Sequence, residues 1–207
     1  MTVGAPWERV GIDLTGKHPR SRRGNYYILT YIDYFTKWAE AYPIPNKEAS
    51  TVCRLLVEEI FPRYGVPLQV ISDQGREFDN RLIKGVCDIM GADKIRTSPY
   101  KASTNGAVER FHRTLNAMLG RVVCESQRDW DERVPMVMAA YRASRHEATG
   151  YSPNFLMFGR EVRAPLTWYW GPNETAYVSL NDFVEEIRTS EEQAYALAKS
   201  QLKKSRT

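Results

Sequence analysis

Three acidic residues occupy positions from which their carboxylates could act together on a phosphate ester. Asp13 lies near the end of a short apolar run, Asp73 directly follows another, and Glu109 stands in the first turns of a long amphipathic segment. Clustered carboxylates repel one another unless a cation neutralises them, and Mg²⁺ and Mn²⁺ prefer oxygen ligands of this kind. Two such ions would activate an attacking oxygen and stabilise the leaving oxygen during in-line displacement at phosphorus. The chemistry indicated is metal-dependent phosphoryl transfer.

Each of these acids also has a simpler interpretation. Acids at a strand end or in the first turn of a helix often act as caps or as solvated charges. Asp33 and Glu77 are rival candidates on position alone, because both fall near strand ends or turns. The choice among the acids therefore depends on spacing and on sequence context.

The elements that would position the acids follow a mixed α/β pattern. Apolar periodicity and turn residues predict strands at 10–14, 26–33, 38–44, 68–72 and 94–97, and helices at 48–64, 80–90, 107–124, 130–145 and 180–204. Three consecutive strands followed by alternating helices and strands indicate a mixed sheet. If the fourth strand lies beside and parallel to the first, Asp13 and Asp73 become neighbours at the carboxyl ends of these strands.

Composition narrows the class of protein without identifying it. The 207 residues include 29 Lys and Arg against 25 Asp and Glu, so any affinity for a polyanion must come from where the charges lie. Cys53, Cys87 and Cys124 are widely spaced in apolar runs and predict buried free thiols, and the three histidines suggest no zinc site. No run approaches the roughly 20 apolar residues that span a bilayer, and the first residues lack a signal-peptide pattern. We expect an intracellular protein that does not enter a membrane.

Four stretches of the chain resemble the integrases of gypsy-class long-terminal-repeat retrotransposons and of retroviruses. Two of them surround acids, ISDQGREF at Asp73 and TSPYKASTNGAVERFHRTL at Glu109, and the others are YIDYFTKWAEAYP and TGYSPNFLMFGREVRAPL. The 35 residues between Asp73 and Glu109 also resemble the spacing of the second and third acids in that family. The resemblance extends over the region from Trp7 to Leu166.

The resemblance implies a fold, a site and an activity. The implied fold is RNase H-like, a five-stranded mixed sheet of order 3-2-1-4-5 flanked by helices. Asp13, Asp73 and Glu109 would be the catalytic residues and the ligands of Mg²⁺ or Mn²⁺, with two ions, and Asp33 would be structural. The implied function is DNA integration: water exposes a 3′-hydroxyl at the element's end, and that hydroxyl attacks target DNA. The implied partners are DNA and further copies of the chain, acting in the nucleus.

Basic residues concentrate beside the proposed site. Between Lys94 and Arg121 six bases face a single acid, and phosphate neutralisation by Lys and Arg supplies most sequence-independent affinity for DNA. An ordinary solvated helix face is the alternative for any one of these bases. The residues expected to bind DNA are Tyr100, Lys101, Ser103, Asn105, Arg110 and Arg113.

These DNA-binding candidates differ in strength. Arg113 lies one turn beyond Glu109 on the same helix face, whereas Arg110 points about 100° away. Gly106 is expected to let the loop before the helix flex. The basic loop GKHPRSRRGN, residues 16–25, is a weaker candidate, because exposed hairpins often carry bases that prevent edge pairing.

The chain departs from the family pattern at two places. It has Lys101-Ala102-Ser103 where the family often has His-Pro-Gln, and His112 where the family often has Asn. Neither change touches the three acids, so we predict a polynucleotidyl transferase. The alternatives are a nuclease or cut-and-paste transposase on the same fold, and a domesticated, non-catalytic DNA-binding or scaffold protein.

The chain is expected to have two parts. A catalytic domain is predicted at 1–166, and a connector and C-terminal helical extension at 167–207, because the stretch from Pro165 to Pro172 is rich in Pro, Trp and Tyr. The integrase zinc-binding module is not found in the sequence, which suggests a fragment of a longer polyprotein.

Overall fold

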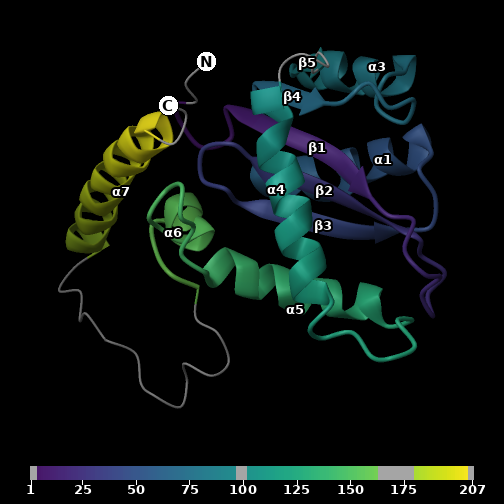
Figure 1. Cartoon of the computed structure of the whole chain (residues 1–207). Helices are drawn as coiled ribbons and strands as arrows, with labels where there is room; N and C mark the ends of the chain where they lie inside the picture. The colour runs from purple at the N-terminus through teal and green to yellow at the C-terminus, as the bar shows by residue number, and fades with distance from the viewer. Residues whose placement is uncertain (1–3, 97–101, 163–179, 205–207) are drawn as a thin grey trace.

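A five-stranded mixed sheet forms the centre of the molecule (Figure 1). The computed structural model describes residues 4–96, 102–162 and 180–204. Strands β1 (Arg9–Thr15), β2 (Tyr27–Asp33) and β3 (Ala39–Ile44) form an antiparallel meander. Strands β4 (Gln69–Ser72) and β5 (Asp93–Arg96) follow in parallel, with β4 beside β1. The order β3-β2-β1-β4-β5 confirms the predicted topology.

Helices cover both faces of the sheet (Figure 1). One face is covered by a helical segment made of α1 (Ala49–Leu55), a π-helical turn (Leu56–Ile60) and α2 (Phe61–Tyr64), together with α3 (Arg81–Met90). The other face is covered by helices α4 (Ala102–Leu119) and α5 (Trp130–Ala143). Beyond α5 lie the short helix α6 (Pro153–Phe158) and the C-terminal helix α7 (Leu180–Lys204).

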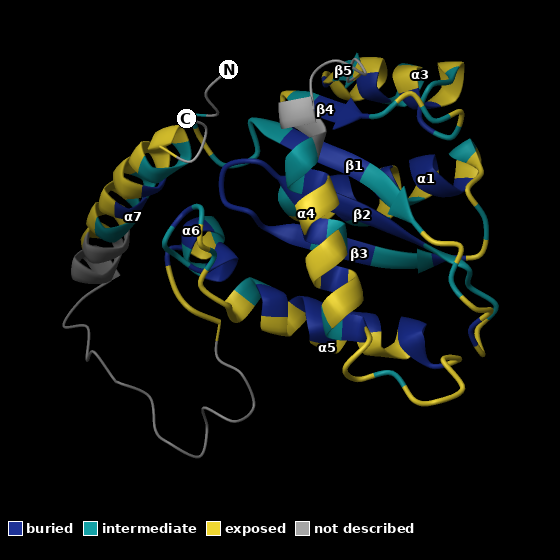
Figure 2. Ribbon diagram, in the orientation of Figure 1, coloured by how far each residue is buried: buried dark blue, intermediate teal, exposed yellow. Residues whose placement is uncertain are grey.

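Both faces of the strands are apolar, as two covered faces require. Along β2, Ile28 and Ile32 pack in the core beneath α4 and α5, whereas Leu29 and Tyr31 pack in the core beneath α1 and α3. Figure 2 shows β2 largely buried, the far end of β1 and part of β3 at intermediate exposure, and exposed residues on the outward sides of the helices. The sheet is therefore a rigid platform, and its ends are the places where polar side chains can meet solvent.

Helix α4 is displaced along the sequence relative to the prediction. It begins at Ala102 rather than at residue 107, and it ends at Leu119 rather than at residue 124. Its first residues are small and polar, so they add no apolar stripe from which the helix could be predicted. Gly106 lies within the helix, so the prediction that it lets a loop flex is wrong.

Because α4 ends at Leu119, one of the three cysteines lies outside the helix in which it was predicted. Cys53 and Cys87 are buried as predicted, but Cys124 is exposed in the connection after α4, so the prediction of three buried thiols is wrong for it.

Helix α6 was not predicted, although its boundary residues are visible in the sequence. The Ser152 hydroxyl accepts a hydrogen bond from the Phe155 backbone N–H at 2.9 Å, Pro153 occupies the first turn, and Gly159 ends the helix in the left-handed region. These are ordinary start and stop signals. The helix is too short to show the apolar periodicity on which the other predictions depended.

Helix α7 packs against the remainder of the molecule. Ala194 and Ala198 are buried in the core that α4 and α5 share, and the Tyr195 ring meets the Phe35 ring edge to face at 5.4 Å. The predicted boundary between 1–166 and 167–207 falls outside the described residues and stays a prediction. No helix in the described ranges is both long and apolar enough to cross a membrane.

Candidate active site

The parallel pairing of β1 with β4 brings the first two acids together. The register aligns Gly11 with Ile71, and Asp13 and Asp73 each lie two residues further along. Asp13 is still within β1, whereas Asp73 is the first residue after β4. Both acids therefore lie at the carboxyl ends of adjacent strands, where α/β sheets commonly place their sites.

A close contact between β1 and α4 brings the third acid to the same place. A Cβ atom on Gly11 would lie 2.7 Å from Val108 Cγ2 and 2.9 Å from the Tyr34 hydroxyl oxygen, so only glycine lets the helix come this near. Val108 is buried, and the next residue, Glu109, is exposed. The contact fixes the height of Glu109 above the strand that carries Asp13.

The pKa of Asp13 responds to burial and to three nearby carboxylates. Burial raises the pKa of Asp13 to about 6, although a hydrogen bond from the Leu14 N–H opposes the shift. The neighbouring carboxylates of Asp73, Glu77 and Glu109 raise this pKa further. Glu77, the rival candidate, therefore lies within electrostatic range of Asp13.

The turn after β4 shapes the surroundings of Asp73. The Gly75 N–H donates to Asp73 Oδ1 at 2.9 Å, and a Cβ on Gly75 would lie 3.0 Å from that oxygen and 2.9 Å from the Glu77 carboxyl carbon. The Gly75 carbonyl accepts hydrogen bonds from the N–H groups of Phe78 and Asp79, each at 2.8 Å. Because Phe78 is buried, the turn is anchored in the core and holds Asp73 in place.

A hydrogen-bonded pair supports Asp13 from beneath. The Thr30 hydroxyl donates to the Asp13 carbonyl oxygen at 3.0 Å, and His112 Nε2 lies 2.7 Å from the same hydroxyl. Since the hydroxyl has one hydrogen, His112 must be the donor, which leaves Nδ1 as the unprotonated nitrogen. Burial lowers the pKa of His112 to about 4, and His18 lowers it further. His112 is therefore neutral at pH 7, and the 3.8 Å between its Nδ1 and Asp13 Oδ2 is not an ion pair there.

A second buried chain supports Asp73. The Lys94 ammonium donates to the Ser72 hydroxyl, which donates to the Asp73 carbonyl oxygen at 2.9 Å. Burial lowers the pKa of Lys94, while the Asp73 charge is among those that oppose this shift. The sequence grouped Lys94 only with the basic segment, because the strand pairing that turns it toward Ser72 depends on the β4–β5 register.

Residues 5–102 match the family model described as the integrase core domain. The chain contains an integrase core domain. The match includes Asp13 and Asp73 and ends before Glu109. The chain is 31% identical over 196 residues to the retrovirus-related Pol polyprotein from transposon 412 of Drosophila melanogaster, an alignment that covers 95% of this chain and 16% of the polyprotein. It thus spans only a small part of that relative.

Solved structures confirm the RNase H-like fold of the integrase core. The chain has a TM-score of 0.65 to a chain of the simian T-cell lymphotropic virus intasome in complex with PP2A regulatory subunit B56 gamma, at 14% identity, covering 86% of this chain and 62% of that one. Its TM-score is 0.59 to the HTLV-2 integrase catalytic core domain in complex with magnesium, in a trimeric form, at 14% identity, covering 72% of this chain and 95% of that one.

The two remaining predictions for acids have different outcomes. Asp33 is fully buried, and its carboxylate accepts hydrogen bonds from Thr36 N–H at 2.8 Å, Thr36 hydroxyl at 2.6 Å and Trp7 N–H at 3.2 Å. Through these hydrogen bonds, Asp33 holds the turn that follows β2. Glu77 Oε1 lies 3.8 Å from the Lys47 ammonium, so Glu77 has a basic partner outside the group of acids.

The expected DNA-binding residues are only partly described. Tyr100 and Lys101 lie outside the described residues, and Ser103 and Asn105 belong to α4 without described side chains. Arg110 and Arg113 are exposed on that helix. Arg110 acts electrostatically on His146, which follows α5, whereas Arg113 is one turn from Glu109.

The carboxylate oxygens of the predicted acids are chemically suited to bind a hard divalent cation. Within the described ranges no three His, Cys, Asp or Glu side chains converge closely enough to hold an ion together. The carboxylate oxygens of the integrase core are nonetheless the ligands that Mg²⁺ and Mn²⁺ prefer. Their mutual repulsion, which raises the pKa of Asp13, is what a cation would relieve.

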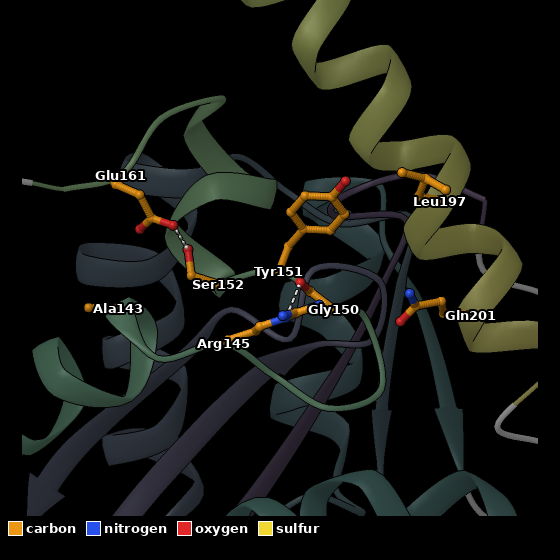
Figure 3. Close-up of a pocket in the computed structure, with 8 residues that line it drawn as sticks. All are labelled: Ala143, Arg145, Gly150, Tyr151, Ser152, Glu161, Leu197 and Gln201. Carbon is orange, nitrogen blue, oxygen red and sulfur yellow. Dashed lines mark hydrogen bonds between the residues drawn. The ribbon is translucent and has the colours of Figure 1, made fainter. Parts of the chain in front are cut away.

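A cavity elsewhere in the molecule does not belong to this site. It has a volume of about 500 Å³ and lies among the end of α5, the segment around α6, and α7 (Figure 3). Arg145 Nε donates to the Gly150 carbonyl at 2.7 Å, and Ser152 donates to Glu161 at 2.7 Å. The polar groups of this cavity therefore bond to one another, and none of the predicted acids lines it.

Proposed function

We propose that this chain acts in DNA integration as a metal-dependent polynucleotidyl transferase, with Asp13, Asp73 and Glu109 as its catalytic residues. The observation that carries the proposal is the parallel β1–β4 register, which aligns the carboxyl ends of the two strands that lead to Asp13 and Asp73. The contact of α4 with Gly11 and the effect of Glu109 on the pKa of Asp13 support the inclusion of the third acid. The family match and the RNase H-like fold support the same reaction class.

The three acids would hold Mg²⁺ or Mn²⁺, as two ions. When bound, the cations would stabilise the attacking and leaving oxygens at phosphorus. The chain's own residues keep the acids in position. The Gly75 N–H donates a hydrogen bond to Asp73 Oδ1. The Thr30 hydroxyl, which is hydrogen-bonded to His112, donates to the backbone carbonyl of Asp13.

The DNA would be the ends of a retroelement and the target into which they are joined. The relatives support this, since one is a retrovirus-related Pol polyprotein from a transposon. The proposed steps are processing of the 3′-end and strand transfer, carried out in the nucleus. Assembly into a homo-oligomer is supported by the neighbours, one described as an intasome and one as trimeric.

The test is the reversal of strand joining on a branched DNA substrate with Mg²⁺ or Mn²⁺. The native chain is compared with Asp73→Asn and Glu109→Gln, and with Glu58→Gln and Asp88→Asn, which change exposed acids on the helices of the other sheet face. Reaction by the native chain and both controls, with at least a hundredfold loss in both site variants, is the expected result.

Other outcomes favour other interpretations. If every variant reacts like the native chain, the assignment of the site is wrong. If no chain reacts but Mn²⁺ binding still depends on Asp73, the domesticated DNA-binding or scaffold role replaces the enzyme. If the branched substrate is cut but never rejoined, a nuclease on the same fold is the better description.

A further inference from the structure

The loop that joins β1 to β2, residues 16–25, carries four bases and no acid. All four are exposed: Lys17, Arg20, Arg22 and Arg23. Arg23 Nε lies 3.9 Å from Glu132 Oε1, and Lys17 Nζ lies 4.9 Å from the centre of the Tyr26 ring. Across the described ranges no acid forms an ion pair with Arg20 or Arg22.

Protection of a sheet edge does not explain these bases. Exposed hairpins often carry Lys and Arg to prevent edge-to-edge pairing. Here β1 and β2 are interior strands: β2 is paired with both β1 and β3, and β1 is paired with β2 up to Thr15 and with β4 over Arg9–Gly11. The loop therefore joins two interior strands, where protection of an edge is needed less than at β3 or β5.

The loop is fixed to the start of α5 rather than free in solvent. The Ser21 hydroxyl and the Asn25 amide both donate to Asp131 Oδ2, at 2.6 and 2.8 Å. The Trp130 indole N–H donates to the Pro19 carbonyl at 2.7 Å. Asp131 and Trp130 are both buried, so these bonds are shielded from water.

The connection between α4 and α5 extends the same charge. The Arg22 N–H donates to the Arg128 carbonyl at 2.9 Å, which ties the two segments together. Arg121 and Arg128 are exposed, whereas Asp129 is buried and accepts a hydrogen bond from the Cys124 N–H. Asp129 and Asp131 are thus turned inward, whereas Glu125 and Glu132 are exposed among six exposed bases, so the surface keeps an excess of positive charge. We name the exposed bases of residues 17–23 together with Arg121 and Arg128 the pinned basic surface.

The pinned basic surface adjoins the acidic site. Its loop begins three residues after Asp13, and the two segments lie together at the end of the sheet toward which β1 runs (Figure 1). The His18 ring packs on Trp130 at 4.9 Å between centroids and lies within electrostatic range of His112, whose Nδ1 is 3.8 Å from Asp13 Oδ2. A DNA strand held at the acids would therefore pass close to these bases.

We propose that the pinned basic surface binds backbone phosphates of duplex DNA next to the phosphodiester held at Asp13, Asp73 and Glu109. The proposal rests on the proposed function, because that function puts DNA at the acids. A planar guanidinium group can donate two parallel hydrogen bonds to two oxygens of one phosphate. Most bases of the surface are arginines. A loop that is already fixed loses less conformational freedom on binding than a free hairpin.

The test measures affinity for a short fluorescent DNA duplex by anisotropy, without divalent cation and over a range of salt concentrations. The double variant Arg20→Ala/Arg22→Ala is compared with the charge-preserving Arg20→Lys/Arg22→Lys. The matched control is Arg54→Ala/Lys84→Ala, which removes two exposed bases from α1 and α3 on the other sheet face. Unfolding curves of each variant check that the fold is retained.

The expected result follows from the release of counterions. Loss of two phosphate contacts should weaken binding about tenfold or more near 0.1 M salt and flatten the log–log salt slope by about 1.8. The lysine variant should regain most of the affinity, and the control should bind like the native chain. An unchanged slope for Arg20→Ala/Arg22→Ala would overturn the proposal, as would an equal loss in the control.

Two further arms separate the proposal from its rivals. If the loop is needed to bind poly-glutamate but not duplex DNA, the surface recognises an acidic protein, and the proposal is overturned. Asp73→Asn should bind the duplex normally while failing to join strands. If Arg20→Ala/Arg22→Ala binds the duplex normally and Asp73→Asn fails to join strands, only the proposed DNA-binding surface is overturned. If Arg20→Ala/Arg22→Ala binds the duplex weakly and Asp73→Asn joins strands like the native chain, only the proposed enzymatic function is overturned.

Discussion

At the scale of single residues, burial and the neighbouring carboxylates both disfavour the charged form of Asp13. Its pKa is raised to about 6 in the folded chain, from an ordinary value of 3.8. The folded chain therefore binds the proton more tightly than the unfolded chain. Stability from this group is fully present below about pH 4 and is lost as the pH rises through 6. The carboxylate lowers the stability of the cation-free protein at neutral pH.

Asp13→Asn should therefore raise the free energy of unfolding at pH 7 by about 1 to 3 kcal/mol in the absence of divalent cations. The gain should vanish near pH 3, below the pKa of this carboxyl in both the folded and the unfolded chain, where it is protonated in both states. Urea unfolding at the two pH values measures the difference. A gain of the same size at both values would show that repulsion and burial of charge are not its cause.

His112 is a positioning residue whose role can be tested by substitution. His112→Ala removes the hydrogen bond to Thr30 and should lower strand joining about fivefold to tenfold, the effect of one lost hydrogen bond of about 1 kcal/mol. His112→Asn keeps a side-chain N–H donor and should restore most of the rate. DNA affinity should be unchanged in both variants. Equal rates for the Ala and Asn variants would contradict this role.

At the scale of elements, the close approach of α4 to β1 determines where Glu109 lies. Gly11→Ala would place a Cβ 2.7 Å from Val108 Cγ2, so the helix must move outward. We expect a loss of about 1 to 3 kcal/mol in the free energy of unfolding and a larger fractional loss of strand joining.

Gly85→Ala in α3 is the matched control for this change. A Cβ at Gly85 meets nothing within 4 Å, so this substitution should be neutral or stabilise the helix by about 0.5–1 kcal/mol. Thermal unfolding and the joining assay, run on both variants, separate the two expectations. Equal stability of the Gly11 and Gly85 variants would mean that α4 does not depend on the glycine contact.

The elements also show what the sequence can reveal. The three strands of the meander followed from apolar runs and turn residues, whereas the order 3-2-1-4-5 followed from the resemblance to the integrase family. The adjacency of Asp13 and Asp73 was conditional on the parallel placement of β4 beside β1, which the structure has. The Thr30–His112 pair could not be predicted, because it depends on the β1–β2 register and on the rotation of α4. The early start of α4 was hidden because its first turn has no apolar residue.

At the scale of the whole molecule, the two faces of the sheet have different surroundings. The face beneath α1 and α3 is a closed apolar layer. The face beneath α4 and α5 adjoins the acids, the pinned basic surface and α7. The net charge of +4 is small, so any affinity for a polyanion must depend on the position of the charges rather than on their sum.

The central claim is that Asp13, Asp73 and Glu109 form one cation site. The most direct measurement is Mn²⁺ binding, followed by the electron paramagnetic resonance of free Mn²⁺, in the native chain, Asp73→Asn, Glu109→Gln and the control Asp88→Asn. Tenfold or weaker binding in both site variants, with no change in the control, is the expected result. Binding by Asp73→Asn as tight as that of the native chain would contradict the claim.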